Sequence, residues 1–492
     1  MEIIIQKAKN GEDTATADGH FLHSNYAPEK EAERFVQNLS LPYNPSSIII
    51  TEPALSYSAK ALRKRFPDIK LGAIRYTPEF SEYDSFFDFV FNYYEHPDFE
   101  VYLESKLTEE ELLSAFFVSW QPSSQVFKDT EKAVWQAIKA ALVRSKTLLY
   151  TRQYFEKKWL LNSCRFIKYL KNPVSLNAPV QKDALIIASG PSLKPYLNFI
   201  KENQNSFFII CLSSAISVCL ENDIIPDLCM STDGGFWAGE HLKKLRKTTI
   251  PLAMPAEAYC SKGLFSKLKI LPLIYDDGIS SELLKNQKLE CKRAVRNGTV
   301  SGTALLFAVQ YCTKNIFFCG LDLAPQKGFQ HTQPNELERN SVFKDNRLNT
   351  KEGRLARAGL PGGSLDIYRE WFASCKLSLG SRTVFRVIEP KQRKNTLGEI
   401  KDIDLKDFSK LTSNEKSKEN FFEVLDFQKA SASSAIKLLS DKEYIDLWKK
   451  QLFPLDYVQL SHNPANTELK EKIEVEWKKL KSKAEEILNE DL

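Results

Sequence analysis

DALIIASGPSLKPYLNFI, residues 183–200, joins an apolar run to an amphipathic segment through a short turn with one glycine, Gly190. The apolar run predicts a buried strand and the amphipathic segment predicts a helix. In an open parallel sheet, ligands bind at the carboxyl ends of the strands, and the first turn of the following helix offers unpaired N–H groups to an anion. The stretch therefore predicts either one wall of a phosphate site, with Ser192 and Lys194 assisting, or a plain strand-to-helix turn.

The same alternation of apolar strands and amphipathic helices continues along the chain. It predicts a parallel, doubly wound α/β sheet of the Rossmann-like kind. Neither GxGxxG nor GxxxxGKS occurs, which disfavours an NAD enzyme and a P-loop NTPase. Strands are expected at 184–188, 207–212, 227–231, 251–255, 270–275, 315–319 and 384–388.

The regions on either side of this sheet have other patterns. The N-terminal region contains a smaller α/β unit, with strands at 47–51 and 70–76 around a helix at 54–66. Helical spacing follows, then a linker at 171–179, and beyond the sheet the chain is charged and helical, with a connection at 413–420. We expect an N-terminal α/β domain (1–100), a helical connecting segment (101–175), a central Rossmann-like domain (176–400) and a helical C-terminal region (401–492).

Composition narrows the class of protein. The chain has 492 residues, 43% of them hydrophobic and 27% charged, with a net charge of +5 and no dense Lys/Arg stripe, so no nucleic-acid partner is expected. The apolar run near the N-terminus is too short for a signal peptide. No apolar run in the chain approaches the ~20 residues of a membrane helix. The nine cysteines form no CxxC pair, which favours reduced thiols in a cytoplasmic protein over disulfides or zinc.

Small polar residues follow four other strands at the same predicted sheet edge. Such residues suit ribose hydroxyls, a base edge and a phosphate, although each also has a structural explanation as a helix cap, a turn brace or a surface histidine. Their shared placement at one edge is the stronger indication. They are Ser213 and Ser214; Thr232 and Asp233; Asn297, Gly298, Ser301, Gly302 and Thr303; and Asp322 with His331 nine residues later.

Acid–base chemistry requires a titratable group near the reacting oxygen. Asp233, Asp322 and His331 are the candidates, and no metal or other cofactor is expected. Asp402-Ile403-Asp404 is a D-x-D triplet of the type that holds a metal-bound sugar nucleotide, but its surroundings, KDIDLKDF, predict a solvated charge run.

The motifs together resemble a known family. LIIASGPSLK resembles the first motif of bacterial CMP-sialic acid sialyltransferases, and NGTVSGTALLFAVQYCTKNIFFCGLDLA resembles their later one. The set is more similar still to the motility-associated factor (Maf) family of flagellin glycosyltransferases. That family has G-x-G-P-S-L, a strand ending in G-x-D-L-A, and then G-x-x-H, here Ser189 to Leu193, Gly320 to Ala324 and Gly328 to His331. FLHSNYAPEKEAERF (21–35) and GGSLDIYREWF (362–372) extend the resemblance over roughly residues 20 to 390.

The resemblance implies a sialyltransferase-like core and a metal-independent glycosyltransferase. It implies a CMP-activated nonulosonic acid donor of the pseudaminic, legionaminic or sialic type, and Ser/Thr hydroxyls of flagellin as acceptor, in support of flagellum assembly. Carried over by position, the donor nucleotide and its phosphate would be bound by Ser189, Gly190, Pro191, Ser192, Ser213, Ser214, Thr232, Asp233, Asn297, Ser301, Gly302 and Thr303.

The chain departs from the sialyltransferases at positions that matter for mechanism. Their asparagines are replaced here by Ser213 and by Thr232 or Asp233, and Ala324 stands in place of a tyrosine. Their catalytic histidine precedes the last core helix, where this chain has residues 360–362, Leu-Pro-Gly. His331 or Asp322 would then act as the base or stabilise the leaving phosphate. A pterin diphosphokinase-like enzyme that uses ATP, and a degenerate flagellin-binding scaffold, are the alternative functions.

Overall fold

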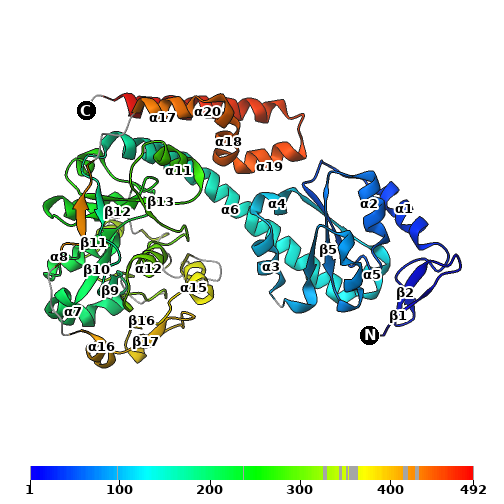
Figure 1. Ribbon diagram of the computed structural model, residues 1–492, viewed down its shortest axis with the longest axis horizontal. Helices are drawn as coiled ribbons and strands as arrows, with labels where there is room; N and C mark the ends of the chain where they lie inside the picture. Colours follow the sequence, from blue (N-terminus) through cyan, green and yellow to red (C-terminus); the bar gives the residue numbers. More distant parts are fainter. Residues whose placement is uncertain are drawn as a thin grey trace. The chain divides into compact units, whose positions relative to one another are not determined.

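The computed structural model describes residues 2–96, 98–236, 238–324, 330–342, 346–348, 350, 353, 364–413, 419–426 and 432–490. The chain divides into two compact units, both drawn in Figure 1. The first comprises Met1–Glu156 and Asp446–Lys479, and the second comprises Lys157–Ile445 and Leu480–Leu492.

A nine-stranded sheet forms the centre of the second unit, in the order β14-β13-β12-β11-β10-β9-β15-β16-β17, and every neighbouring pair is parallel. The predicted parallel α/β sheet is therefore confirmed, and each predicted strand is present within two residues of its expected ends. The two short outermost strands, β14 and β17, were not predicted. The bounds are β9 (Asp183–Ile187), β10 (Phe207–Leu212), β11 (Leu228–Met230), β12 (Leu252–Pro255), β13 (Ile270–Ile274), β14 (Lys292–Arg293), β15 (Ile316–Cys319), β16 (Val384–Val387) and β17 (Lys401–Ile403).

Helices cover both faces of this sheet (Figure 1). Short 3₁₀ turns precede or replace several of them because the strands end in tight turns, as at η3 (Pro191–Tyr196), η5 (Ser213–Ala215) and η6 (Lys243–Lys247). The helices between and after these strands are α7 (Leu197–Asn203), α8 (Ile216–Glu221), α9 (Ala238–Leu242), α10 (Lys262–Phe265), α11 (Gly278–Lys285), α12 (Val300–Tyr311), α13 (Glu336–Val342), α15 (Ser364–Ser374) and α16 (Leu405–Leu411), and α17 (Ala432–Leu439) follows them beside α20 (Thr467–Asn489) in Figure 1.

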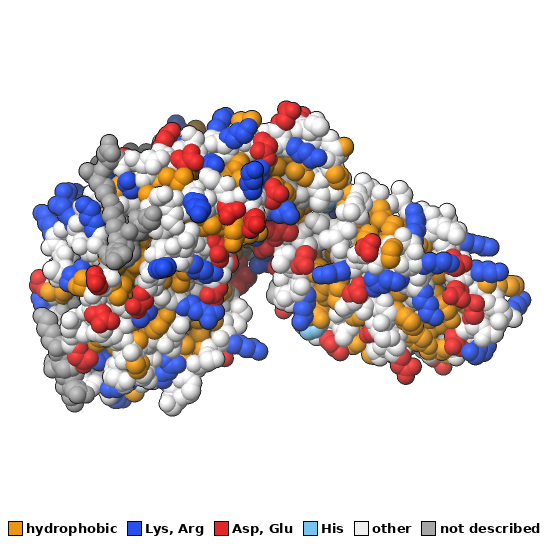
Figure 2. Space-filling model, turned by 45° about the horizontal axis from the view of Figure 1, so that its top comes forward, with side chains coloured by type: hydrophobic (Ala, Val, Ile, Leu, Met, Phe, Trp, Pro, Cys, Tyr) orange, Lys and Arg blue, Asp and Glu red, His pale blue; other side chains and the backbone are white. Residues whose placement is uncertain are grey.

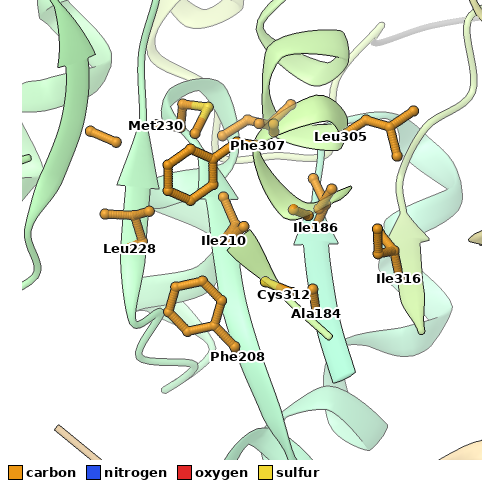
Figure 3. Packing of buried hydrophobic residues seen from close by; sticks show 14 of the residues in the cluster. Ala184, Ile186, Phe208, Ile210, Leu228, Met230, Leu305, Phe307, Cys312 and Ile316 are labelled. Carbon is orange, nitrogen blue, oxygen red and sulfur yellow. The ribbon is translucent and has the colours of Figure 1, made fainter. Parts of the chain in front are cut away.

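The main core lies between one face of the sheet and helix α12. Alternate strand residues point to this face, including Ile186 and Ile210, and Leu305 and Phe307 of α12 pack against them (Figure 3). On the opposite face, Phe408 of α16 stacks on Phe207 with ring centroids 5.6 Å apart. Since both faces are covered, the central strands are largely apolar, which is why their prediction from sequence succeeds.

The order of the strands creates one switch point. From β9 the chain builds outward through β10 to β14, then returns to the other side of β9 with β15 and continues to β17. The turns after β9 and β15 therefore lie side by side at the carboxyl edge of the sheet, where open α/β sheets bind their ligands. They carry the GPSL and G-x-D motifs of the sequence.

The D-x-D triplet at 402–404 is not a solvated charge run, and that prediction was wrong. It lies on β17, where the carboxylate of Asp402 accepts hydrogen bonds from Nε and Nη2 of Arg386 over 2.6 and 2.9 Å. Arg386 is 1% exposed. Asp404 caps α16 by accepting from the backbone N–H of Asp407. The pairing of residues sixteen positions apart arises from the adjacent parallel strands β16 and β17 and has no local sequence signal.

The linker expected at 171–179 contains a strand instead. β8 (Val174–Leu176) pairs antiparallel with β18 (Phe422–Val424), which follows the predicted connection at 413–420. Within that connection, residues 414–418 lie outside the described residues. The strand is short, and its partner is more than two hundred residues away, so periodicity gives no sign of it.

The first unit is built on a four-stranded parallel sheet of order β6-β5-β4-β7. The predicted strands at 47–51 and 70–76 are β4 and β5. The stretch 101–175, predicted as helical, also contains β7, which pairs with β4, so the expected boundary at residue 100 cuts through this sheet. The elements are β1 (Ile3–Lys7), β2 (Asp13–Ala17), β3 (His20–Phe21), α1 (Pro28–Asn38), β4 (Ser47–Thr51), α2 (Tyr57–Arg65), β5 (Lys70–Arg75), β6 (Phe89–Asn92), α3 (Phe99–Lys106), α4 (Glu109–Ser114), β7 (Ala115–Ser119), α5 (Gln121–Val126) and α6 (Lys128–Tyr169).

The C-terminal helices are α18 (Lys442–Leu452), α19 (Pro454–His462) and α20 (Thr467–Asn489). Helix α20 buries an apolar stripe that includes Ile473 and Trp477, as its alternating pattern predicted. Lys/Arg and Asp/Glu side chains are interspersed over the face of the molecule in Figure 2. Among the described residues, no helix is both long enough and apolar enough to cross a bilayer.

All nine cysteines are free thiols, and seven of them are buried. Burial raises the pKa of the Cys260 and Cys312 thiols to about 12. These groups therefore stay protonated near neutral pH and pack as small apolar side chains.

Candidate functional site

The two turns at the switch point are hydrogen-bonded directly to each other. The backbone N–H of Gly190 donates to the carbonyl oxygen of Gly320 over 2.9 Å. A Cβ atom on Gly190 would lie 2.4 Å from that oxygen, and Gly320 itself has a φ of +77°. Both positions therefore require glycine because the turns approach closely, which is a packing reason independent of any phosphate.

Asp322 occupies the place in which the sequence suggested a phosphate. Its Oδ2 accepts the backbone N–H of Ser192 over 3.0 Å, and its other oxygen accepts the Ser192 hydroxyl. Ser192 is 2% exposed and Asp322 is 7% exposed. Both donors of Ser192 thus bind a carboxylate of the protein, and its role toward a donor phosphate stays a prediction.

Burial is the largest influence on Asp322 and raises the pKa of its carboxyl group. The hydrogen bonds from Ser192 act in the opposite direction, as do the positive charges of Arg386 and His331. A buried carboxylate that accepts two hydrogen bonds at the start of η3 is a brace of the switch point. The structural explanation thus accounts for both oxygens of Asp322, each of which accepts a hydrogen bond from Ser192.

Residues 330–338 pass across the ends of β9 and β10. The Thr332 N–H donates to the Ser189 carbonyl over 2.6 Å, and its hydroxyl donates to the Gly190 carbonyl over 2.8 Å. Asn335 donates its side-chain amide to the Ser214 carbonyl over 3.2 Å. The hydroxyls of Ser189 and Ser214 lie 2.8 Å apart. The fold thus brings three predicted site positions together: Ser189, Ser214 and the loop that carries His331.

His331 is held by a glutamate that the sequence gave no reason to select. Its Nδ1 lies 3.0 Å from Oε1 of Glu338, and the backbone N–H groups of Gln330 and His331 donate to the same oxygen over 2.6 and 3.0 Å. A carboxylate can only accept, so in the neutral imidazole Nδ1 carries the proton and Nε2 carries a lone pair. Nε2 has no partner among the described residues, and the side chain is 41% exposed. This is the arrangement of an oriented general base.

A second histidine, His241 on α9, was also missed by the sequence reasoning. Helix α9 contacts both η5 and α13, and His241 is 6% exposed. Burial, and then the positive charge that His331 can carry, lower the pKa of His241 to about 4. His241 is therefore neutral near pH 7 and packs beside the site without adding charge to it.

Replacing His241 by Asn is expected to flatten the acid dependence of stability. The unfolded chain protonates this histidine near its ordinary pKa of 6.5, whereas the folded chain does so only near 4. Between these pH values the unfolded state binds the extra proton, so the wild type loses about 1.4 kcal/mol per pH unit as the pH falls. Urea midpoints across this window test the difference, with His20→Asn on exposed β3 as the control. Parallel curves for wild type and His241→Asn would contradict it.

Asp233 lies on the turn after β11 and is exposed. Its Oδ1 accepts the backbone N–H of Gly235 over 2.7 Å, so it braces the glycine turn, as the structural explanation suggested. Its Oδ2 has no partner among the described residues and remains available to a ligand. Burial, and then the negative charge of Asp233, raise the pKa of Tyr368 on α15.

Polar groups of the turn before α12 form hydrogen bonds with one another. Thr299 caps the helix by accepting the Ser301 N–H, and Asn297 donates to the Thr303 hydroxyl over 3.2 Å. Ser301 is 6% exposed and Thr303 is 2% exposed. A Cβ on Gly302 would lie 2.8 Å from the Trp371 ring. These side chains build the turn, and the expectation that Ser301 and Thr303 face the donor phosphate stays a prediction.

Arg296, immediately before this turn, is a cation that was not predicted. Its guanidinium carbon lies 4.8 and 4.3 Å from the ring centroids of Trp159 and Tyr275, and Nη2 lies 3.1 Å from Oε1 of Glu257. Glu257 is 4% exposed, and burial raises the pKa of its carboxyl group. The sandwich fixes the edge formed by the ends of β12, β13 and β14.

Some predicted positions lie outside the described residues. These are Gly328 of the G-x-x-H motif and residues 360–362, where the sialyltransferases have their histidine. Among the described residues, no group of three or more His, Cys, Asp or Glu side chains is arranged to hold a metal ion.

Comparison of the sequence with known proteins finds one family and two relatives. Residues 157–328 match the family described as 6-hydroxymethylpterin diphosphokinase MptE-like. An uncharacterized protein of Treponema pallidum (strain Nichols) is 33% identical over 279 residues, which is 56% of this chain and 60% of that protein. A second one from the same organism is 26% identical over 121 residues, which is 24% of this chain and 58% of that protein. The chain thus spans about three fifths of the length of both relatives.

Among solved structures, the MAf glycosyltransferase from Magnetospirillum magneticum AMB-1 is similar to this chain. The likeness covers 99% of this chain and 90% of that one, with a TM-score of 0.47 and 12% sequence identity. A likeness this distant carries no information on activity. The function must be argued from the site itself.

Proposed function

We propose that the protein is a glycosyltransferase that moves a nonulosonic acid from a CMP-activated donor to a Ser or Thr hydroxyl of flagellin. The observation that carries the proposal is the His331–Glu338 pair, which leaves Nε2 of His331 as a free base beside the switch point. The resemblance of the GPSL, G-x-D-L-A and G-x-x-H motifs to the Maf family supports the choice of donor and acceptor.

The proposed step is a single displacement at the anomeric carbon of the donor sugar. The acceptor hydroxyl oxygen forms the new C–O bond while the bond from that carbon to the phosphate oxygen breaks, and CMP leaves with the electron pair. His331 Nε2 takes the proton of the hydroxyl. The result is inversion at the anomeric carbon.

The remaining site residues would bind the nucleotide. The free Oδ2 of Asp233 suits a ribose hydroxyl, and the Ser189–Ser214 hydroxyl pair, at the ends of β9 and β10, suits a phosphate oxygen or a base edge. Glu338 is a positioning residue, since it reaches the reacting atoms only through His331.

CMP is expected to bind the purified protein without added metal, and Asp233→Ala is expected to weaken that binding. A hydrogen bond from a ribose hydroxyl to a carboxylate contributes about 1.5–3 kcal/mol, or roughly tenfold or more in Kd. Calorimetric titration with CMP measures Kd for the wild type and for Asp233→Ala. Asp407→Ala on the exposed surface of α16 removes the same group elsewhere and should leave Kd unchanged. Folded wild-type protein that binds no CMP rules out the proposed donor.

The second candidate function is that of a pterin diphosphokinase-like enzyme, which the family match over residues 157–328 favours. Such an enzyme would transfer a diphosphate from ATP to a hydroxymethylpterin, with Mg²⁺ on the phosphates. Incubation with ATP, Mg²⁺ and 6-hydroxymethylpterin, followed by mass spectrometry, separates the two. A pterin product without CMP binding would establish the second function in place of the first.

A further inference from the structure

A basic and aromatic pocket lies on the far side of helix α9 from the candidate site. We call it the α9 pocket. Its volume is about 540 Å³, within the range of small-ligand sites. Its lining residues are Phe236, Gly239, Glu240, Lys243, Arg246, Lys247, Tyr259, Ser261, Gly263 and Leu264.

Two aromatic rings form one wall of the α9 pocket. Phe236 and Tyr259 meet edge to face, with centroids 5.4 Å apart. Phe236 is 58% exposed. Gly239 permits the arrangement, because a Cβ there would lie 2.7 Å from the Tyr259 ring. The wall therefore presents a preformed apolar surface to solvent.

The lining of the pocket is also positively charged. Three cations face one carboxylate, Glu240, and only Lys243 is paired with it, over 2.6 Å. Arg246 and Lys247 of η6 have no carboxylate partner among the described residues, and both are exposed. An occupant that complements this surface carries negative charge next to an apolar or aromatic group.

The α9 pocket is tied to the candidate site by short connections. Phe236 follows Asp233 by three residues, and the Tyr259 N–H donates to the Asp233 carbonyl over 2.9 Å. On α9, Gly239 and Glu240 line the pocket. His241 of the same helix is buried, and the positive charge of His331 contributes to lowering its pKa. One five-residue helix therefore separates the pocket from the proposed base.

We propose that the α9 pocket binds an acidic segment of the acceptor polypeptide, with one apolar or aromatic side chain against Phe236 and Tyr259 and carboxylates at Arg246 and Lys247. The proposal rests on the proposed function, since it assigns the acceptor side of the same site. A polypeptide occupant explains both features at once: the ring wall takes a side chain, and the cations hold the chain beside α9 so that a neighbouring hydroxyl can reach His331.

The experiment uses the full chain and a short fluorescein-labelled peptide made of Glu, Ser and Phe, with its Lys-for-Glu counterpart as a control ligand. Fluorescence anisotropy is expected to detect the acidic peptide and not the basic one, with weaker binding at higher salt. Arg246→Glu with Lys247→Glu should weaken binding by about tenfold or more, and Phe236→Ala should weaken it severalfold. Lys478→Glu with Lys479→Glu, on the exposed face of α20, makes the same change of charge and should leave binding intact.

CMP titration of the same variants separates this proposal from the function on which it rests. Loss of peptide binding with unchanged CMP binding supports the acceptor surface. Peptide binding by a wild type that binds no CMP preserves the surface and removes the proposed function. Equal binding of the acidic peptide to wild type and to the Arg246/Lys247 variant overturns the proposal, as does a wild type that binds neither peptide. The proposal is also overturned if free CMP or ATP binds this pocket in preference to the peptide. Such binding would appear as competition that is lost in the Arg246/Lys247 variant.

Discussion

His331→Ala is expected to lower kcat for sugar transfer by about 10²–10⁴-fold, the contribution of a positioned general base, with little change in KM for the donor. The reason is geometric. The imidazole presents Nε2 to the site because Glu338 holds Nδ1, and no other described residue binds Nε2. The measurement is steady-state transfer from a CMP-activated nonulosonic acid to purified flagellin, followed by the mass of the flagellin.

Two further variants sharpen this test. Glu338→Gln retains an acceptor for Nδ1–H but loses the charge, so kcat should fall by less than in His331→Ala. His20→Ala removes an exposed histidine on β3 and serves as the matched control. Activity of His331→Ala within twofold of wild type would eliminate His331 as the base. Absence of transfer by a folded wild type that still binds flagellin would instead favour the scaffold alternative.

Gly190→Ala is expected to destabilise the second unit by about 3 kcal/mol or more, at the upper end of overpacking effects. The added Cβ would lie 2.4 Å from the Gly320 carbonyl oxygen and 2.7 Å from Cγ of Asp322. Both neighbours are fixed, the first as backbone and the second by its hydrogen bonds to Ser192. Relief therefore requires the two turns to move apart.

Gly263→Ala is the control, since a Cβ there meets nothing within 4 Å. Urea unfolding gives the free energies, and hydrogen exchange of peptides that cover 183–192 localises the loss to the switch point. Equal stability of the two variants would mean that the turns are not held as closely as the contact distances indicate. CMP binding by Gly190→Ala should also weaken, but only as a consequence of this displacement.

The fold could be predicted from the sequence where burial imposes a strong pattern. Strands β9, β10 and β15 lie under helices on both faces, so their residues are largely apolar, and their ends were predicted within two residues. Strand β7 was missed because AFFVS directly follows a helical stretch, and β14 and β17 were missed because they are short. The pairing of Asp402 with Arg386 depends on strand order, which no local pattern encodes.

The site could be predicted only in part, because residue type and position do not reveal which polar groups hydrogen-bond to one another. Asp322 and Ser192 were both expected to act on a ligand, and they bind each other. His331 could be selected from the sequence because of its polar, glycine-containing surroundings. Glu338 could not, because the loop that places it beside the imidazole has neither the helical nor the strand pattern of apolar residues. His241 and Arg296 gave no signal, because their environments arise from packing between segments distant in sequence.

The close contact of the two turns at the switch point also makes their glycines energetically interdependent. A side chain at Gly190 would meet the Gly320 carbonyl, and one at Gly320 would meet the Ala188 carbonyl 2.3 Å away. Either substitution forces the same separation, so the second would cost less once the first has been made, and the two free-energy changes would not add. Gly320 also has a φ of +77°, which favours glycine however far apart the turns lie, so sequences that share this fold should retain Gly320 and, with it, Gly190.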